Sequence, residues 1–390
     1  MKYILLGAVR RGCFTTGGAK VIYKNANVFD GNGFTKKDFA VSEGLFSEVN
    51  EGESVDLDGA YVLPGLIDIH THGNSGADFY DADKAGLEKM AGYYARNGIT
   101  TVVPASMTLP YDMLSKAFAC GYEFSKEQHP GCARIAGAHM EGPYFSEKKK
   151  GAQNGAYLKL PDFDGFRELY NDCCGFIKIV DIAPELEGAV DFIERAKELC
   201  TVSVGHTDAS YEEARAAFGA GATHVTHLYN AMPALHHRKP GVIGAASENG
   251  SVTAELICDG QHIHESAVRA AFKMFPGRIC LISDSLRCTG MPDGKYEFGG
   301  QPIWLEGSVA RLEDGNLAGS ASNLFLCMKN AIRFGIPVPD AINAATIIPA
   351  REICMDDTIG SIDAGKSADF IVCDRDFNLQ KVFIRGTSVE

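Results

Sequence analysis

The chain has 390 residues, 45% of them hydrophobic, which suffices for one large barrel with an appended domain or for two average domains. Its net charge of −13 and the lack of any basic run argue against nucleic acid as a partner. The 12 cysteines contain no C-x-x-C pair, so we expect reduced, mostly buried thiols in a cytoplasmic protein.

Residues 1–20 are predicted to be an N-terminal extension that precedes the fold. Their one apolar run, Tyr3 to Val9, is short for a signal peptide and far too short to cross a membrane. No apolar stretch of 18 residues occurs elsewhere in the sequence, so no membrane partner is expected.

The two ends of the chain share a pattern of short strands separated by turns. The pattern covers residues 21–60, with KVIYKNANVFDG near the start, and residues 355–390, with KVFIRG near the end. Two β-rich ends of this kind are expected to pair into one small sheet domain that flanks the middle of the chain.

Residues 61–354 alternate short apolar strands with helical patterns, which is typical of parallel βα units. Helices are expected at Asp83–Asn97 and Glu187–Leu199, and another begins at Ser210, where Glu213 has capping-box spacing. Eight such units favour a TIM barrel, in which catalytic side chains lie at the carboxyl ends of the strands. The predicted strands are Leu63–Ile69, Thr100–Pro104, Arg134–His139, Phe176–Ile182, Thr201–Val204, Thr223–Thr226, Ser251–Ile257 and Arg278–Ser283.

The pair His70 and His72 directly follows the first predicted strand. In an extended chain, residues i and i+2 share a face, about 6.6 Å apart, so both imidazoles can approach one ion at about 2.0–2.1 Å. Later strands also end in residue types that ligate metals, and together they predict one metal-binding pocket. These residues are His139 and Glu141 after strand three, His206 after strand five, His227 after strand six, Asp259 and His262 after strand seven, and Asp284 after strand eight.

Imidazole and carboxylate ligands in one pocket suit a divalent metal ion such as Zn²⁺, Fe²⁺, Mn²⁺ or Co²⁺. Such an ion lowers the pKa of bound water to about 7, and a neighbouring carboxylate can accept the proton and pass it to the leaving group. Asp284, alone on the last strand, is the predicted general base. The alternative is that Asp284 caps the helix that follows.

The loop after the sixth strand, NAMPALHHRKPG, gathers positive charge in an otherwise acidic protein. Arg238 offers the fork-shaped donor that suits a phosphate group. Asn230 and Ala231 precede it with backbone N–H groups. The loop is therefore a predicted phosphate site, and a solvated basic turn is the alternative.

Characteristic motifs occur in a fixed order over residues 21–386. They are LPGLIDIHTHG, HMEGPYFSEKKKGAQ, VGHTDAS, THLYNAMPALHHRKPG, ICDGQHIH, LISDS, GNLAGSASNL and AATIIPAREI. Together they resemble the N-acetylglucosamine-6-phosphate deacetylases of the amidohydrolase superfamily. The resemblance implies an α/β fold, namely a distorted TIM (β/α)8 barrel with a small β-sandwich domain formed by both chain ends. It also implies hydrolysis of N-acetylglucosamine 6-phosphate to glucosamine 6-phosphate and acetate, in a homodimer or homotetramer.

The resemblance assigns roles to individual residues. Asp284 would be the general base and then the acid, and Glu141, His206 and His227 would hold the metal common to the family. Arg269, seven residues after His262, is expected to assist from a neighbouring subunit. The substrate would be bound by Asn230, Ala231 and Arg238 at the phosphate, by His262 at the sugar hydroxyls, and by Ala152, Gln153, Leu317, Ala318 and Gly319 around it. Asp259, three residues before His262, is also expected among the substrate-binding residues.

Members of this family differ at the H-x-H position, where some keep both histidines and hold two metals and others hold one. This chain keeps His70 and His72, so one or two ions are expected, with Glu141 bridging in the second case. Gln153 stands where some members carry His, so Gln153 or a metal must polarise the acyl carbonyl. Lys178 lies inside its strand and is given no bridging role.

Three alternatives remain open. N-acetylgalactosamine 6-phosphate differs from the first substrate at one hydroxyl, and shared motifs do not separate the two. Another amidohydrolase reaction, on a cyclic amide or as a deamination, is disfavoured by the HMEGP and NAMP…HHR segments. A non-catalytic relative would have lost ligands, whereas this chain keeps them.

Overall fold

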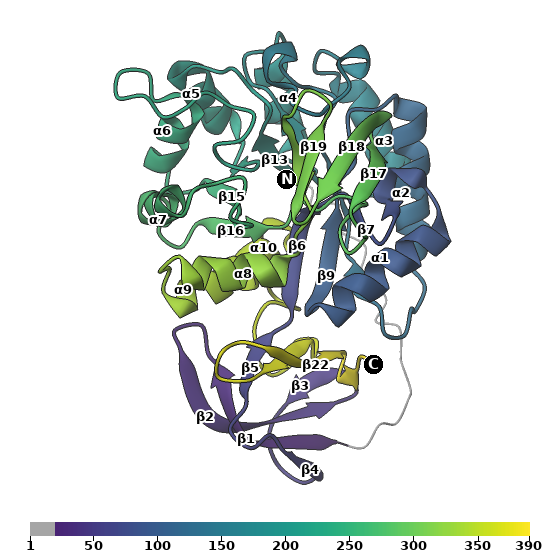
Figure 1. Cartoon of the computed structure of the whole chain (residues 1–390), viewed down its shortest axis with the longest axis vertical. Helices are drawn as coiled ribbons and strands as arrows, with labels where there is room; N and C mark the ends of the chain where they lie inside the picture. Colours follow the sequence, from purple (N-terminus) through teal and green to yellow (C-terminus); the bar gives the residue numbers. More distant parts are fainter. Residues whose placement is uncertain (1–19) are drawn as a thin grey trace, which may run out of the picture.

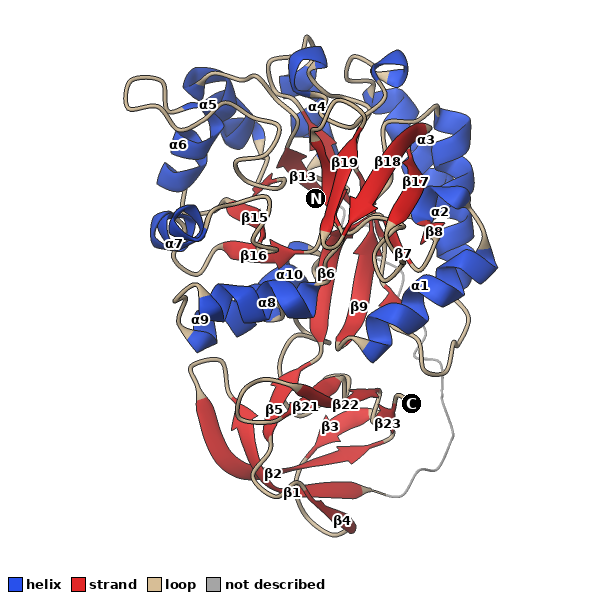
Figure 2. Cartoon of the chain, in the orientation of Figure 1, coloured by secondary structure: helices blue, strands red, loops and turns tan. Residues whose placement is uncertain are grey.

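The computed structural model describes residues 20–390, so the predicted extension 1–20 lies almost entirely outside the described residues. Figure 1 shows a large α/β part above a smaller part made of strands. Strands from both ends of the chain build the smaller part, as Figure 2 shows. The predicted barrel with a small domain formed by both chain ends is confirmed.

The barrel strands form two parallel runs, β6–β9–β10 and β11 to β16. The runs meet at one edge through a parallel bridge between Ala105 and His139. At the other edge the N–H of Asp284 donates to the carbonyl of His70 at 2.9 Å. The third strand is interrupted at residues 136–137, which makes the barrel irregular. The strands are β6 (Leu66–Thr71), β9 (Ile99–Pro104), β10 (Arg134–Ile135), β11 (Ala138–Met140), β12 (Ile177–Ile182), β13 (Thr201–Val204), β14 (His224–Val225), β15 (Thr253–Ile257) and β16 (Ile279–Ile282).

Helices surround the barrel (Figure 2). The helix predicted at Asp83–Asn97 is α1 (Lys84–Arg96), and the capping box of Ser210 and Glu213 at the start of α5 is confirmed. None of the helices within residues 20–390 combines the length and hydropathy that a membrane span requires. The other helices are α2 (Tyr111–Ser125), α3 (Phe163–Asp172), α4 (Ala189–Ala196), α5 (Tyr211–Ala220), α6 (Gly241–Glu248), α7 (Glu265–Met274), α8 (Leu324–Arg333), α9 (Val338–Ala344) and α10 (Ile347–Glu352), with short 3₁₀ turns η1 (Phe79–Asp81), η2 (Glu147–Lys149) and η3 (Gly155–Tyr157).

The small domain is an eight-stranded sheet with the path β23–β22–β21–β5–β1–β2–β3 and β4 paired to β1. Its core is aromatic, since Tyr23 stacks on Phe39 at 5.0 Å between ring centroids and Phe370 stacks on Phe383 at 4.3 Å. Rings from the two chain ends also pack against each other, since Tyr23 lies 5.3 Å from Phe370 and 5.6 Å from Phe383 between ring centroids, so neither end buries its apolar face alone. The strands are β1 (Val21–Phe29), β2 (Phe34–Ser42), β3 (Leu45–Ser47), β4 (Glu53–Asp56), β5 (Tyr61–Pro64), β21 (Phe370–Cys373), β22 (Leu379–Ile384) and β23 (Thr387–Ser388).

The apolar run predicted as one strand, Leu63–Ile69, is divided at Gly65. Before it, β5 pairs with β1 and β21 in the small sheet, and after it β6 pairs with β9 in the barrel. A Cβ atom on Gly65 would lie 2.1 Å from the Oγ1 of Thr100, so no larger side chain fits where the chain passes between the domains.

Gly65→Ala should therefore lower the free energy of unfolding by about 1–3 kcal/mol, because an added methyl group in a packed site forces its neighbours to move. Gly219→Ala is the matched control. A Cβ there would meet nothing within 4 Å in helix α5, so this change should stabilise the protein by about 0.5–1 kcal/mol. Urea unfolding of both variants measures the difference, and equal stabilities would show that the chain at Gly65 has room to relax.

The sequence patterns do not predict a four-stranded antiparallel sheet that follows β16 (Figure 1). Its first strand is mostly exposed, so it carries no continuous apolar run that would reveal it. The N–H of Ser320 donates to the carbonyl of Asp284 at 2.8 Å, which joins this sheet to the end of the eighth barrel strand. Its strands are β17 (Gly294–Phe298), β18 (Gln301–Glu306), β19 (Val309–Leu312) and β20 (Leu317–Ser320), and a two-stranded turn is formed by β7 (Gly73–Asn74) and β8 (Ala77–Asp78).

Candidate active site

Five of the residues predicted as metal ligands at the strand ends converge on one buried centre. Glu141 lies in the middle, with its Oε1 3.2 Å from the Nε2 of His206, 3.3 Å from the Nε2 of His227 and 3.4 Å from the Nε2 of His70. Its Oε2 lies 3.5 Å from the Nε2 of His72. All five side chains are buried. Two potential ligand groups result, Glu141–His206–His227 and His70–His72–Glu141, and they share Glu141.

The ring nitrogens of this centre have the geometry of metal ligands. The Nε2 atoms of His206 and His227 lie 3.1 Å apart, close to the roughly 3.3 Å that separates two nitrogens bound to one tetrahedral ion. The Nδ1–H of His206 donates to the carbonyl of Lys149 at 2.9 Å, which leaves the Nε2 lone pair for an ion. The Nε2 of His70 is buried with no hydrogen-bond partner among residues 20–390. The residues therefore fit a divalent cation.

The carboxylates of the centre are held ionised. Burial raises the pKa of Glu141, but contacts with the imidazoles of His206 and His227, and the positive charge that His70 carries when it is protonated, outweigh it and hold that pKa well below its usual value. Burial also raises the pKa of Asp284, but the contact with His72 and the positive charges of His70 and His72 in their protonated forms lower it overall. An ionised carboxylate is the form that binds a cation or accepts a proton.

Asp284 lies between the H-x-H pair and the open cavity. Its Oδ1 is 3.3 Å from the Nε2 of His72 and 3.8 Å from the Nε2 of His70. The helix that follows in the chain, α8, is capped by Asn323, which disfavours a capping role for Asp284. Asp284 has a φ of 49°, in the left-handed region, where backbone strain often marks functional sites.

A cavity of about 330 Å³ opens over the centre, which is within the size range of small-molecule sites. Phe298, from β17, lines it and packs its ring against His72 at 5.0 Å between centroids. The predicted substrate residues that line the cavity are Ala152, Gln153, Asn230, Ala231, His262, Leu317, Ala318 and Gly319.

Three predicted binding residues are not among the described residues that line this cavity. Asp259 accepts a hydrogen bond from the Nδ1 of His262 at 2.7 Å, so it orients that ring. Arg238 is exposed, and its guanidinium lies 2.8 Å from the Nε2 of His237. Arg269 donates to the carbonyl of Phe334 at 2.8 Å. Neither guanidinium lines the cavity of the single chain.

Gln153 contacts the metal-ligand centre directly. Its Nε2 donates to the Oε2 of Glu141 at 2.6 Å, and its Oε1 accepts the N–H of Thr108 at 2.7 Å. The side-chain amide is therefore fixed at both ends and orients the Glu141 carboxylate, a contact that the sequence does not reveal.

Sequence reasoning also missed Glu255, a fully buried residue of β15 whose side chain reaches His70. One signal could have found it: an acidic residue inside the apolar strand TAELI is rare unless it is paired. Phe298 carries no comparable signal, because its strand is not predicted.

Comparison with known proteins supports the motif analysis. Residues 61–389 match the family described as "Amidohydrolase family". An N-acetylglucosamine-6-phosphate deacetylase of Vibrio furnissii is 35% identical over 86% of this chain and 85% of its own, and an N-acetylgalactosamine-6-phosphate deacetylase of Escherichia coli O157:H7 is 34% identical over 84% and 88%. A solved structure of a variant N-acetylglucosamine-6-phosphate deacetylase from Mycobacterium smegmatis, in complex with N-acetyl-D-glucosamine 6-phosphate, aligns with a TM-score of 0.90 at 28% identity and covers 95% of this chain and 100% of that chain. The resemblance inferred from the motifs is confirmed, and the chain belongs to the amidohydrolase family.

Proposed function

We propose that this chain hydrolyses the N-acetyl group of N-acetylglucosamine 6-phosphate, giving glucosamine 6-phosphate and acetate in amino-sugar catabolism. The observation that carries the proposal is the convergence of Asp284 with Glu141, His206 and His227 beside a cavity lined by the predicted substrate residues. Relatives named for this reaction, similar over most of the chain, support it.

Asp284 carries the proton transfers in this proposal. When bound, a divalent ion supplies an acidified water and polarises the acetyl carbonyl. The ionised Asp284 accepts a proton from the attacking water, and the protonated carboxyl then donates it to the amide nitrogen, so that the amine leaves as a neutral group. Gln153 meanwhile holds Glu141 in place through the 2.6 Å hydrogen bond.

The ligand set suits Zn²⁺, Fe²⁺, Mn²⁺ or Co²⁺. We infer two ion positions that share Glu141, because His70 and His72 form a second potential ligand group with it. We place the reaction in the cytoplasm, supported by eleven unpaired cysteines within residues 20–390. A homodimer or homotetramer is supported by the family resemblance, and sedimentation measures it.

A substrate panel tests the proposal. Acetate release is measured with N-acetylglucosamine 6-phosphate, its galacto epimer, unphosphorylated N-acetylglucosamine and a cyclic amide. We expect the highest kcat/KM for the first. The similarity to an N-acetylgalactosamine-6-phosphate deacetylase makes the galacto epimer the second candidate substrate. A higher kcat/KM for the epimer than for N-acetylglucosamine 6-phosphate would establish that alternative. Hydrolysis of the cyclic amide alone would refute a deacetylase.

Arg238→Ala should lower kcat/KM for the phosphorylated sugar by about 10- to 150-fold, because a lost hydrogen bond to a charged group costs about 1.5–3 kcal/mol. Turnover of the unphosphorylated sugar should change little. Lys239→Ala, at the next position of the same exposed loop, is the control for loss of one positive charge. Equal losses on both sugars would assign Arg238 to the loop's structure rather than to phosphate binding.

A further inference from the structure

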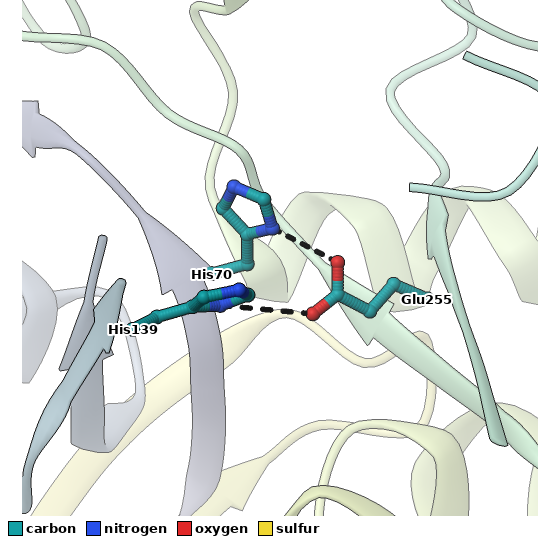
Figure 3. A group of neighbouring side chains, drawn as sticks. All are labelled: His70, His139 and Glu255. Atoms are coloured by element: carbon teal, nitrogen blue, oxygen red, sulfur yellow. Dashed lines mark hydrogen bonds and ion pairs between the residues drawn. The ribbon is translucent and has the colours of Figure 1, made fainter. Parts of the chain in front are cut away.

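Glu255 is a fully buried carboxylate beneath the metal-ligand centre, and it touches both halves of that centre. Its Oε2 accepts a hydrogen bond from the Nδ1 of His70 at 2.9 Å, drawn in Figure 3. The same oxygen accepts the backbone N–H of His227 at 3.0 Å. One oxygen of Glu255 therefore links His70 of one ligand group to His227 of the other.

Glu255 does not form a metal site of its own with His70 and His139, although Figure 3 shows the three side chains together. The Nδ1 of His139 donates to the carbonyl of Ile69 at 3.0 Å, and its Nε2 pairs with Asp181 at 2.8 Å. A carbonyl only accepts, so the Nδ1 of His139 carries a hydrogen and has no lone pair for an ion. The role left for Glu255 is to hold the imidazole of His70.

The negative charge of Glu255 has a buried counter-charge on the side away from the centre. Its Oε1 lies 3.1 Å from the Nε2 of His224, whose Nδ1 lies 2.8 Å from Glu352 of α10. Burial lowers the pKa of His224, but the charges of Glu352 and Glu255 and their hydrogen bonds outweigh it and raise it to about 10. The Oε1 of Glu255 therefore faces His224 on the side away from the centre, and its Oε2 is left to accept from His70 and His227.

We propose that Glu255 is the positioning residue that assembles the second ion position. It holds His70 with a hydrogen on Nδ1, which directs the buried, unpartnered Nε2 lone pair toward Glu141. It also anchors the N–H of His227, whose φ of 28° is a strained conformation that needs outside support. This inference rests on the proposed metal dependence. In it, the carboxylate of Glu255 couples the two ligand groups.

The test measures metal binding rather than turnover. Apo-protein is titrated with Co²⁺ alone, and bound metal and the visible spectrum are recorded for wild type, Glu255→Gln and His70→Asn. We expect two ions in the wild type. Glu255→Gln, which keeps the shape but loses the charge, should bind the second ion 10- to 100-fold more weakly. It should thus resemble His70→Asn, and because the amide oxygen of Gln can still accept the N–H of His227, it should keep the first ion and its spectrum.

Glu352→Gln is the matched control, because it removes the outer carboxylate of the same chain of contacts without touching a predicted metal ligand. Its second-ion affinity should stay within about threefold of wild type. An equal loss of second-ion affinity in Glu352→Gln would overturn the proposal, because it would indicate a general effect of removing buried charge. An unchanged second-ion affinity in Glu255→Gln would also overturn it. If Glu255→Gln does not fold, Glu255→Asp is used, and normal Co²⁺ binding in that shortened variant would also overturn it.

The same samples separate this inference from the proposed function. Acetate release from N-acetylglucosamine 6-phosphate is measured on the Co²⁺-loaded wild type. Two bound ions with the predicted loss in Glu255→Gln, but no acetate released, would support the role of Glu255 and refute the deacetylase. Acetate release, together with second-ion binding that does not change in Glu255→Gln, would support the deacetylase and refute the role of Glu255.

Discussion

Asp284→Asn should lower kcat for the acetylated sugar phosphate by about 10²- to 10⁴-fold, the range that positioned proton transfer contributes. The amide keeps the size of the carboxylate and its place 3.3 Å from His72, but it cannot accept a proton. Because the same group must also protonate the departing amine, both steps slow. KM should change much less than kcat.

Metal content and thermal unfolding of Asp284→Asn provide the controls, since a lost ion or an unfolded chain would also lower the rate. Asp259→Asn is a useful comparison, because that carboxylate orients His262 and would alter substrate binding more than the proton transfer. A near-normal kcat in folded, metal-loaded Asp284→Asn would remove Asp284 from its role as base and acid.

Removing the metal should abolish turnover, and adding Zn²⁺ or Co²⁺ should restore it. The expected loss is the largest of all, because the ion supplies both the acidified water and the polarised carbonyl. His206→Gln should reproduce the loss in the presence of metal. His129→Gln is its control, because that imidazole stacks on Phe124 in another part of the chain and should leave activity unchanged. A fully active protein after chelation and dialysis would contradict metal dependence.

His72→Gln addresses the second ion separately. The Nε2 of His72 lies 3.5 Å from the Oε2 of Glu141 and 3.3 Å from the Oδ1 of Asp284. The variant should lose the second ion and turn over more slowly while it retains the ion of the Glu141–His206–His227 group. Unchanged metal content and rate would leave the chain with a single functional ion.

The predicted strand-end residues came together because a parallel barrel gathers the carboxyl ends of all its strands at one mouth. That rule alone places His70, Glu141, His206, His227 and Asp284 in one region, and their types then indicate a metal site. What it does not provide is the set of contacts that cross between distant strands.

Those unpredicted contacts depend on tertiary packing. The hydrogen bond from Gln153 to Glu141 joins a loop to a strand end, and Phe298 reaches His72 from a mostly exposed strand, β17, that carries no clear apolar pattern. The division of the apolar run at Gly65 depends on the close approach of Thr100, which no local pattern reveals. Glu255 is an intermediate case. An acidic residue inside an apolar strand indicates that it has a buried partner, but the sequence does not identify that partner.

Proton NMR of the metal-loaded protein with N-acetylglucosamine 6-phosphate tests the central claim most directly. The account predicts that the acetamide methyl signal is lost and that free acetate and glucosamine 6-phosphate appear in equal amounts, at a rate abolished by chelation. An acetamide signal that persists in the presence of each of the four metals would contradict it.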